Sequence, residues 1–262
     1  MWSSSPLLEE SLFVRPAVLL AYTCDLPARC LVCNSMQYNG EYGCWKCLQA
    51  GQTVKTGPNG HVRAFPFKHV DPKGSLRTNE MTLEHAKEAM LKQMAGKPRY
   101  AIKGVKSFSW LSILQHHDII RGRAMDYMHG VLLGVQNLLL KLWFNNSYSK
   151  KVFRLYNMVS VVDERLKNIF PTLDIKRLPR SISEHLKYWE VNELCSFLLY
   201  YGLPVLYGLL PDKYFEHYFY FVRAIYLLLL ESISEEQLKV AEQLLQQFCF
   251  KFSQLYELRY QT

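Results

Sequence analysis

The sequence lacks the features that would place the chain in a membrane. Apolar runs such as Ala224–Leu230 fall well short of the roughly 18 residues that a membrane-spanning helix needs. The first residues include Glu9 and Glu10 but no basic stretch, which is a poor match to a secretory signal peptide. We therefore expect a soluble, intracellular protein without a membrane partner.

The chain also lacks internal repeats, low-complexity segments and the His-Glu-x-x-His motif, and the last absence disfavours a general zinc hydrolase. Acidic residues are fewer than basic ones: 23 Asp and Glu stand against 31 Lys and Arg, a net charge of +8. This balance favours a polyanion such as DNA as a partner. We expect non-specific DNA binding that weakens with salt, through the basic residues Lys97, Arg99, Lys103, Lys106, Arg121 and Arg123.

The hydrophobic pattern predicts one strand, then loops, then helices. Leu12–Tyr22 is strand-like, and residues 23–80 are rich in Gly and Pro, which is typical of loops. Met81–Met94 reads as a helix with Thr78 as its N-cap.

From residue 111 the hydrophobic period is helical almost to the end. The predicted helices are His129–Phe144, Lys151–Phe170, one opened by Ser181-x-x-Glu184 and running to Tyr201, one from Pro211 to Leu230, and one opened by Ser234-x-x-Gln237 and running to Tyr260. We therefore expect a mainly α chain with a small α/β part, divided into residues 1–110 and a helical block, 111–262.

The strongest chemical signal is a set of two Cys-x-x-Cys pairs. In a reducing compartment this spacing is more often a metal-binding turn than a disulfide. Zinc takes four tetrahedral Cys and His ligands, and a loop-rich segment of this length needs something to hold it. We expect structural zinc bound by Cys44, Cys47, His61 and His69, or by an alternative set in which Cys30 and Cys33 join Cys44 and Cys47.

Several acidic residues are candidates for chemistry. Asp25 follows an apolar run, the place where open α/β sheets carry their reactive groups. Glu193 lies in an apolar helix, where a carboxylate is costly unless it is paired, metal-bound or turned to solvent. Asp126 and His129 share a helix face at i,i+3, either as a core pair or as half of a metal site.

Five short motifs follow one another along the chain. They are Asp25-Leu26-Pro27-Ala28, Tyr42-Gly43-Cys44-x-x-Cys47, Gly60-His61-x-Arg63-x-Phe65-Pro66, Asp126-x-Met128-His129, and Trp189-x-x-x-Glu193-Leu194 with LLYYGLPVL. Together they resemble the transposases of En/Spm-like (CACTA) DNA transposons, most of all the animal members and their domesticated derivatives. The resemblance covers roughly residues 12–262.

The resemblance implies an RNase H-like core with a large helical insertion, and a nuclear location. It also implies cut-and-paste DNA strand transfer by an Asp/Asp/Glu triad that holds two Mg²⁺ or Mn²⁺ ions. By this resemblance Asp25 matches the second acid and Glu193 the third, while Asp126 and His129 match an accessory Asp-x-x-His element. Cys44 and Cys47 match the family's Cys-x-x-Cys.

A match to the first catalytic acid is missing, since Glu9 and Glu10 are the acids that precede Asp25. We therefore expect a partial RNase H-like core that lacks its beginning and does not cut DNA alone. The alternative is a non-catalytic, domesticated, zinc-stabilised module that binds DNA or protein. The sequence leaves open whether the chain self-associates.

Overall fold

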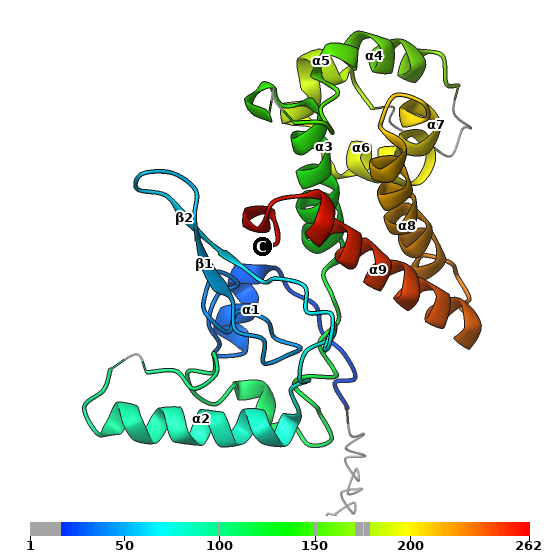
Figure 1. Ribbon diagram of the computed structural model, residues 1–262. Coiled ribbons are helices and arrows are strands. Elements are labelled where there is room, and N and C mark those ends of the chain that lie inside the picture. Colours follow the sequence, from blue (N-terminus) through cyan, green and yellow to red (C-terminus); the bar gives the residue numbers. More distant parts are fainter. Residues whose placement is uncertain (1–16, 99, 149–150, 171–174, 176–178) are drawn as a thin grey trace, which may run out of the picture.

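The computed structural model describes residues 17–98, 100–148, 151–170, 175 and 179–262 (Figure 1). Helices predominate in this part of the chain, and its strands form one two-stranded sheet, so the expectation of a mainly α chain is confirmed. Figure 1 shows two lobes. One contains α1, the β1–β2 hairpin and α2, and the other contains the later helices, with α9 running back toward the hairpin.

The N-terminal lobe has few regular elements. They are α1 (Leu26–Val32), β1 (Gln52–Lys55), β2 (His61–Ala64), α2 (Asn79–Met94) and the 3₁₀ turn η1 (Trp110–Ile113). The two strands are antiparallel and pair from Gln52 opposite Ala64 to Lys55 opposite His61. Most of the lobe is therefore loop, as the Gly and Pro content predicts.

A small hydrophobic core holds these loops together. Cys33, Trp45, Ile119 and Ile120 are each at most 5% exposed and form one cluster. The indole N–H of Trp45 donates to the carbonyl oxygen of Ile119 at 3.3 Å. Ile119 and Ile120 thus pack with the N-terminal lobe, although they follow the domain boundary expected at residue 110.

The apolar run Ala17–Tyr22 does not form the strand that its sequence predicts; residues 12–16 lie outside the described part. Val18 and Leu20 are 49% and 83% exposed. Tyr22 makes an isolated parallel bridge to Arg123, and its N–H donates to the Gly122 carbonyl at 2.8 Å. A strand needs a partner along its whole length, and among the described residues the sheet contains β1 and β2 alone.

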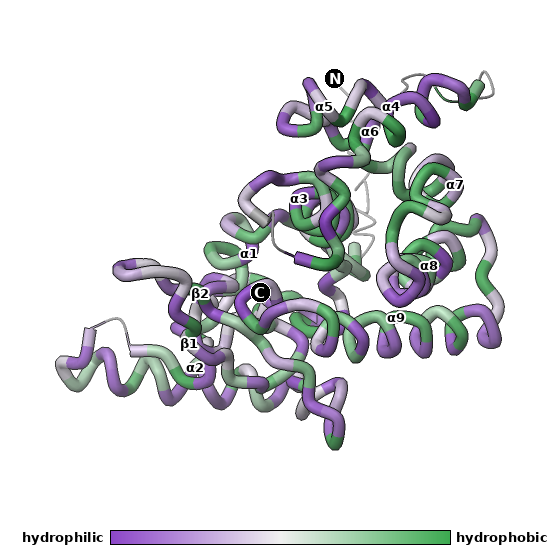
Figure 2. Tube along the Cα trace, turned by 45° about the horizontal axis from the view of Figure 1, so that its top comes forward, coloured by the Kyte–Doolittle hydropathy of each residue, from purple (hydrophilic) through white to green (hydrophobic). Residues whose placement is uncertain are grey.

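The helical lobe surrounds a large hydrophobic core. Its elements are η2 (Met128–Gln136, π-helical), α3 (Asn137–Phe144), η3 (Asn146–Tyr148), η4 (Tyr156–Met158), α4 (Val159–Lys167), α5 (Ile182–His185), η5 (Leu186–Tyr188), α6 (Val191–Ser196), η6 (Phe197–Tyr201, π-helical), α7 (Gly202–Leu206), α8 (Asp212–Leu228), α9 (Glu235–Leu255) and η7 (Leu258–Tyr260). Trp143, Phe197, Tyr201 and Tyr218 are at most 2% exposed in this core. Figure 2 shows mainly hydrophobic residues in α7, whereas hydrophobic and hydrophilic residues alternate along α9.

All three helix starts predicted from capping residues are confirmed, but the capping box predicted at Ser181 does not form. The side chains of Thr78 and Ser234 cap α2 and α9 as expected. The Ser181 hydroxyl instead contacts Nδ1 of His185 at 3.0 Å and makes no cap. The cap of α5 comes from Asp163 on α4, whose carboxylate accepts from the N–H groups of Ile182 and Ser183 at 2.6 and 3.1 Å.

The helix predicted from Ser181 to Tyr201 is also interrupted. Trp189 has extended backbone (φ −63°, ψ 132°) and separates η5 from α6, which starts with a new capping box at Glu190 and Glu193. Because of this break, the Glu193 side chain points toward the segment that precedes α5 and pairs there with Arg180.

The C-terminal end of the chain contacts the hairpin. The N–H of Phe65 donates to the Gln261 carbonyl at 2.6 Å, and the N–H of Phe67 donates to the Gln261 side chain at 3.2 Å. The His69 ring packs edge-on against Phe250 of α9, with 4.9 Å between centroids. These contacts join the two lobes.

No helix in the described ranges is long and apolar enough to cross a membrane.

Candidate functional site

Glu193 is fully buried and held by four hydrogen bonds. Its Oε1 accepts from Nε of Arg180 at 2.8 Å and from the Arg180 backbone N–H at 3.1 Å. Its Oε2 accepts from Nη2 of Arg180 at 2.8 Å and from the Glu190 backbone N–H at 2.8 Å. A carboxylate has about four lone-pair sites, so these bonds occupy the positions that a metal ion would need.

The environment of Glu193 keeps it ionised. Burial alone would raise the pKa of this carboxyl, but the guanidinium of Arg180 and the backbone N–H groups of Glu190 and Arg180 lower it to about 2. The charge is therefore balanced locally by Arg180, which is itself 33% exposed. This is the geometry of a structural ion pair.

Asp25, the other predicted catalytic acid, lies in the other lobe (Figure 1). Its Oδ1 accepts from the Ala28 N–H at 2.7 Å and caps α1. α1 and α6 are separated in both Figures 1 and 2, so the structure does not bring Asp25 and Glu193 together.

Asp126 and His129 form a local pair at the start of η2. Asp126 Oδ2 lies 2.6 Å from Nδ1 of His129, and Oδ1 accepts from the His129 backbone N–H at 3.0 Å. That backbone bond, followed by the contact to the ring, lowers the pKa of the Asp126 carboxyl. The pair therefore fixes the first turn of this helical segment.

Several charged side chains influence the pKa of the Cys24 thiol. Burial raises the pKa of this thiol, Arg123 and Arg29 oppose the rise, and Asp25 and Asp126 reinforce it. Asp25 and Asp126 thus both raise the pKa of the same thiol.

The two cysteines of the second Cys-x-x-Cys pair are brought together. The Cys47 thiol and the backbone N–H groups of Cys47 and Lys46 donate to the Cys44 sulfur, which lowers the pKa of Cys44 to about 5 although burial opposes this. The bond to Cys44 and burial raise the pKa of Cys47. Backbone N–H groups that point at sulfur favour thiolate, which is the form that binds zinc.

The other predicted zinc ligands lie elsewhere. His61 is exposed on β2, and His69 packs against Phe67 and Phe250. Cys30 donates to the Leu26 carbonyl at 3.1 Å, and the Cys33 sulfur lies 3.0 Å from the Tyr22 hydroxyl. In the part of the chain that the structure describes, no three Cys, His, Asp or Glu side chains are grouped to hold a metal. Cys44 and Cys47 therefore fit one half of a zinc site.

Arg77 positions the Cys44–Cys47 turn and was not singled out by the sequence. Its Nε donates to the carbonyl oxygens of Cys44 and Cys47, each at 3.1 Å, and its Nη2 donates to that of Lys103 at 2.6 Å. The residue is 5% exposed. Arg180 and Asp163 were missed for the same reason: each bonds to a segment more than ten residues away, and no spacing rule pairs them.

Comparison with known proteins found no match of this chain to any protein-family model, curated protein or solved structure.

Proposed function

We propose that this chain is a transposase-derived DNA-binding protein, stabilised in part by zinc at Cys44 and Cys47, that does not itself cut DNA. In this proposal the N-terminal part derives from an RNase H-like core, the helical block derives from the family's insertion, and the protein acts in the nucleus. The observation that carries the non-catalytic part is the Glu193 carboxylate, because its lone pairs are occupied by Arg180 and the backbone.

The charge distribution favours DNA binding through the N-terminal lobe. Residues 1–126 contain 16 Lys and Arg against 10 Asp and Glu, so +6 of the net +8 lies there. Lys97, Lys103 and Lys106 are exposed on the loop after α2. Gln93 fixes this loop by donating to the carbonyls of Tyr100 and Lys106, both at 2.7 Å.

Aromatic rings accompany these lysines. The ammonium group of Lys92 lies 4.9 Å from the centre of the Tyr100 ring, and that of Lys97 lies 5.9 Å from it. Lys103 lies 4.6 Å from the centre of the Tyr42 ring and donates to its hydroxyl. Lysines interleaved with aromatic rings are typical of surfaces that track a nucleic-acid backbone.

We expect the protein to retard supercoiled plasmid DNA without nicking it in Mg²⁺ or Mn²⁺. The Lys97→Glu, Lys106→Glu double variant should bind DNA roughly tenfold to a hundredfold more weakly. It should also lower the slope of log affinity against log salt concentration by about 2, because two phosphate contacts are lost. Gel retardation at several salt concentrations measures the binding, and plasmid topology measures the nicking.

A matched control is Lys213→Glu with Lys239→Glu, two exposed lysines of α8 and α9. It makes the same charge change and should leave most of the affinity. Binding that does not respond to salt would contradict the DNA proposal. Metal-dependent nicking abolished by Asp25→Ala would show that the chain is catalytic.

We also expect purified protein to contain zinc, as measured by elemental analysis. Cys44→Ser together with Cys47→Ser should remove it, because thiolate is the ligand that these turns present. His61→Ala and Cys30→Ser then separate the two predicted ligand sets. Cys249→Ser on the exposed face of α9 is the control and should retain the metal. A double cysteine variant with unchanged zinc content and stability would contradict the zinc proposal.

A further inference from the structure

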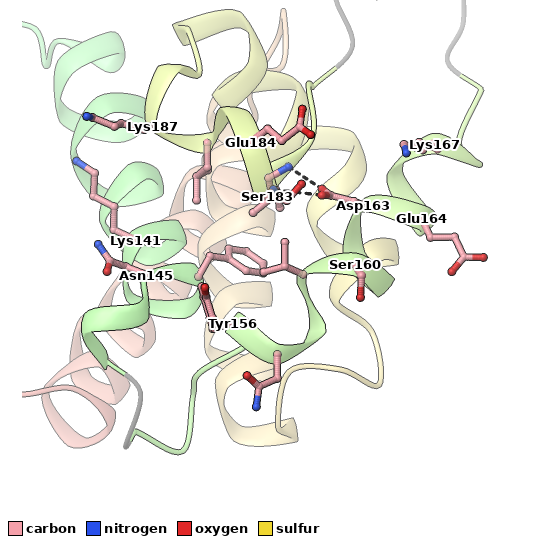
Figure 3. A pocket seen from close by; sticks show the side chains of 15 residues that line it. Lys141, Asn145, Tyr156, Ser160, Asp163, Glu164, Lys167, Ser183, Glu184 and Lys187 are labelled. Atoms are coloured by element: carbon pink, nitrogen blue, oxygen red, sulfur yellow. Dashed lines mark hydrogen bonds between the residues drawn. The ribbon is translucent and has the colours of Figure 1, made fainter.

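The helical lobe has a groove that no predicted site uses. It encloses about 850 Å³ between α3, α4 and α5 (Figure 3). Grooves of this size are in the range that holds ligands of the size of a nucleotide. Phe144 and Leu186 contribute apolar surface to it, and Lys141, Lys167 and Lys187 contribute ammonium groups.

Three lysines of the groove make no ion pair with a described acidic side chain. Lys141, Lys167 and Lys187 have no acidic partner among the described residues; Lys187 lies over the Tyr188 ring at 5.5 Å. In Figure 3 the ammonium ends of Lys141 and Lys187 extend to the same side of the groove. Two like charges so placed favour an anionic group between or beside them.

The acids of the groove compete weakly with such a ligand. Both oxygens of Asp163 accept from the backbone N–H groups that start α5, so its charge is already compensated. Glu164 is exposed, and in Figure 3 its carboxylate points away from the lysine side. The Glu184 side chain is 75% exposed and lies 3.7 Å from the ring of its neighbour His185.

Aromatic and amide groups line the rest of the groove. Tyr156 is 44% exposed, and its ring is flanked by the Arg154 guanidinium, 5.4 Å from the ring centre. Asn145 and Asn157 each use their Oδ1 as a local acceptor, for Ser147 and Arg154, so their amide N–H groups are left to donate. An exposed ring beside amide donors is suited to stack on a base and bind its edge.

We infer that this groove binds a nucleotide, with its phosphate at Lys141 and Lys187 and its base against Tyr156. The nucleotide is either free or part of a single strand. The groove lies in the helical lobe, away from the basic loop after α2, so this inference does not depend on duplex DNA binding.

Titrations with AMP and with a labelled ten-nucleotide oligo(dT) test the inference. Both the Lys141→Ala, Lys187→Ala double variant and Tyr156→Ala should weaken binding about tenfold or more, as expected for the loss of charge-assisted bonds or of one stacking ring. Binding of AMP and oligo(dT) alike indicates a free nucleotide, and binding of oligo(dT) alone indicates a single strand. Either result supports a nucleotide site in the groove, provided that the Lys141, Lys187 and Tyr156 variants weaken the binding.

The control variant is Lys213→Ala with Lys239→Ala. It removes two exposed lysines, one of which also lies over a tyrosine ring, 5.2 Å from its centre. It should bind like the unmodified protein. Three results would overturn the inference: no binding of either nucleotide probe, equal weakening by the control variant, or binding of an acidic peptide in place of the nucleotides. Loss of duplex binding in the Lys97, Lys106 variant leaves this test unaffected.

Discussion

Replacing Arg180 with methionine should destabilise the helical lobe by about 3 to 5 kcal/mol, because it leaves the Glu193 charge buried without its partner. Glu193 is fully buried and receives two of its four hydrogen bonds from the Arg180 side chain. The Arg180 side chain also donates to the carbonyl of Tyr188, so it joins the segment before α5 to the start of α6. Denaturant unfolding followed by circular dichroism measures the loss.

The pH dependence gives a second test of the same pair. The folded-state pKa of Glu193, about 2, lies below the ordinary 4.5. A lowered carboxyl pKa contributes stability that is complete above pH 4.5 and is lost as the pH falls toward 2, and the size here is about 3 kcal/mol. In Arg180→Met this acid-dependent loss should shrink, since the native pKa then moves back toward that of the unfolded chain.

Two comparisons make the result specific. Arg223→Met removes an exposed arginine of α8 and should change the stability by less than about 0.5 kcal/mol. Adding Glu193→Gln to Arg180→Met should recover part of the loss, because it removes the unpaired charge. If Arg180→Met retains full stability while purified protein binds Mg²⁺ through Glu193, the carboxylate is a metal ligand and the structural interpretation is wrong.

Replacing Arg77 with alanine should destabilise the N-terminal lobe by about 3 kcal/mol or more. Three buried or partly buried carbonyls, of Cys44, Cys47 and Lys103, would lose a charged donor, and a hydrogen bond to a charged group is worth about 1.5 to 3 kcal/mol. Because these bonds hold the Cys44–Cys47 turn, zinc affinity should fall as well. Hydrogen exchange over residues 42–47 and 103–105 should show the loss directly.

Two control variants separate the effect of the several N–H donors of Arg77 from the effect of its charge. Arg77→Lys keeps the charge but cannot reach three carbonyls, so it should recover only part of the stability. Arg121→Ala removes an arginine whose side chain is 91% exposed and should be nearly neutral. Unchanged hydrogen exchange around Cys44 in Arg77→Ala would show that the turn is held by other contacts.

Local hydrogen bonds explain which parts of the fold could be predicted. The caps at Thr78 and Ser234 use a side chain and an N–H only three residues apart, so a short motif contains both partners. The Cys44–Cys47 turn is local in the same way. Ser181 has the same spacing to Glu184, but Asp163 from another helix takes the N–H groups at the start of α5, and no local pattern reveals that.

By itself the sequence determined the helical class, several helix ends and the adjacency of Cys44 and Cys47, because each depends on residues within a turn of one another. The tertiary structure decided the rest. It limited the pairing of Ala17–Tyr22 to a single bridge from Tyr22 to Arg123, kept His61 and His69 away from the cysteines, and paired Glu193 with Arg180, 13 residues earlier. A buried charge must find an opposite charge wherever packing brings one, and that choice depends on contacts between segments rather than on spacing along the chain.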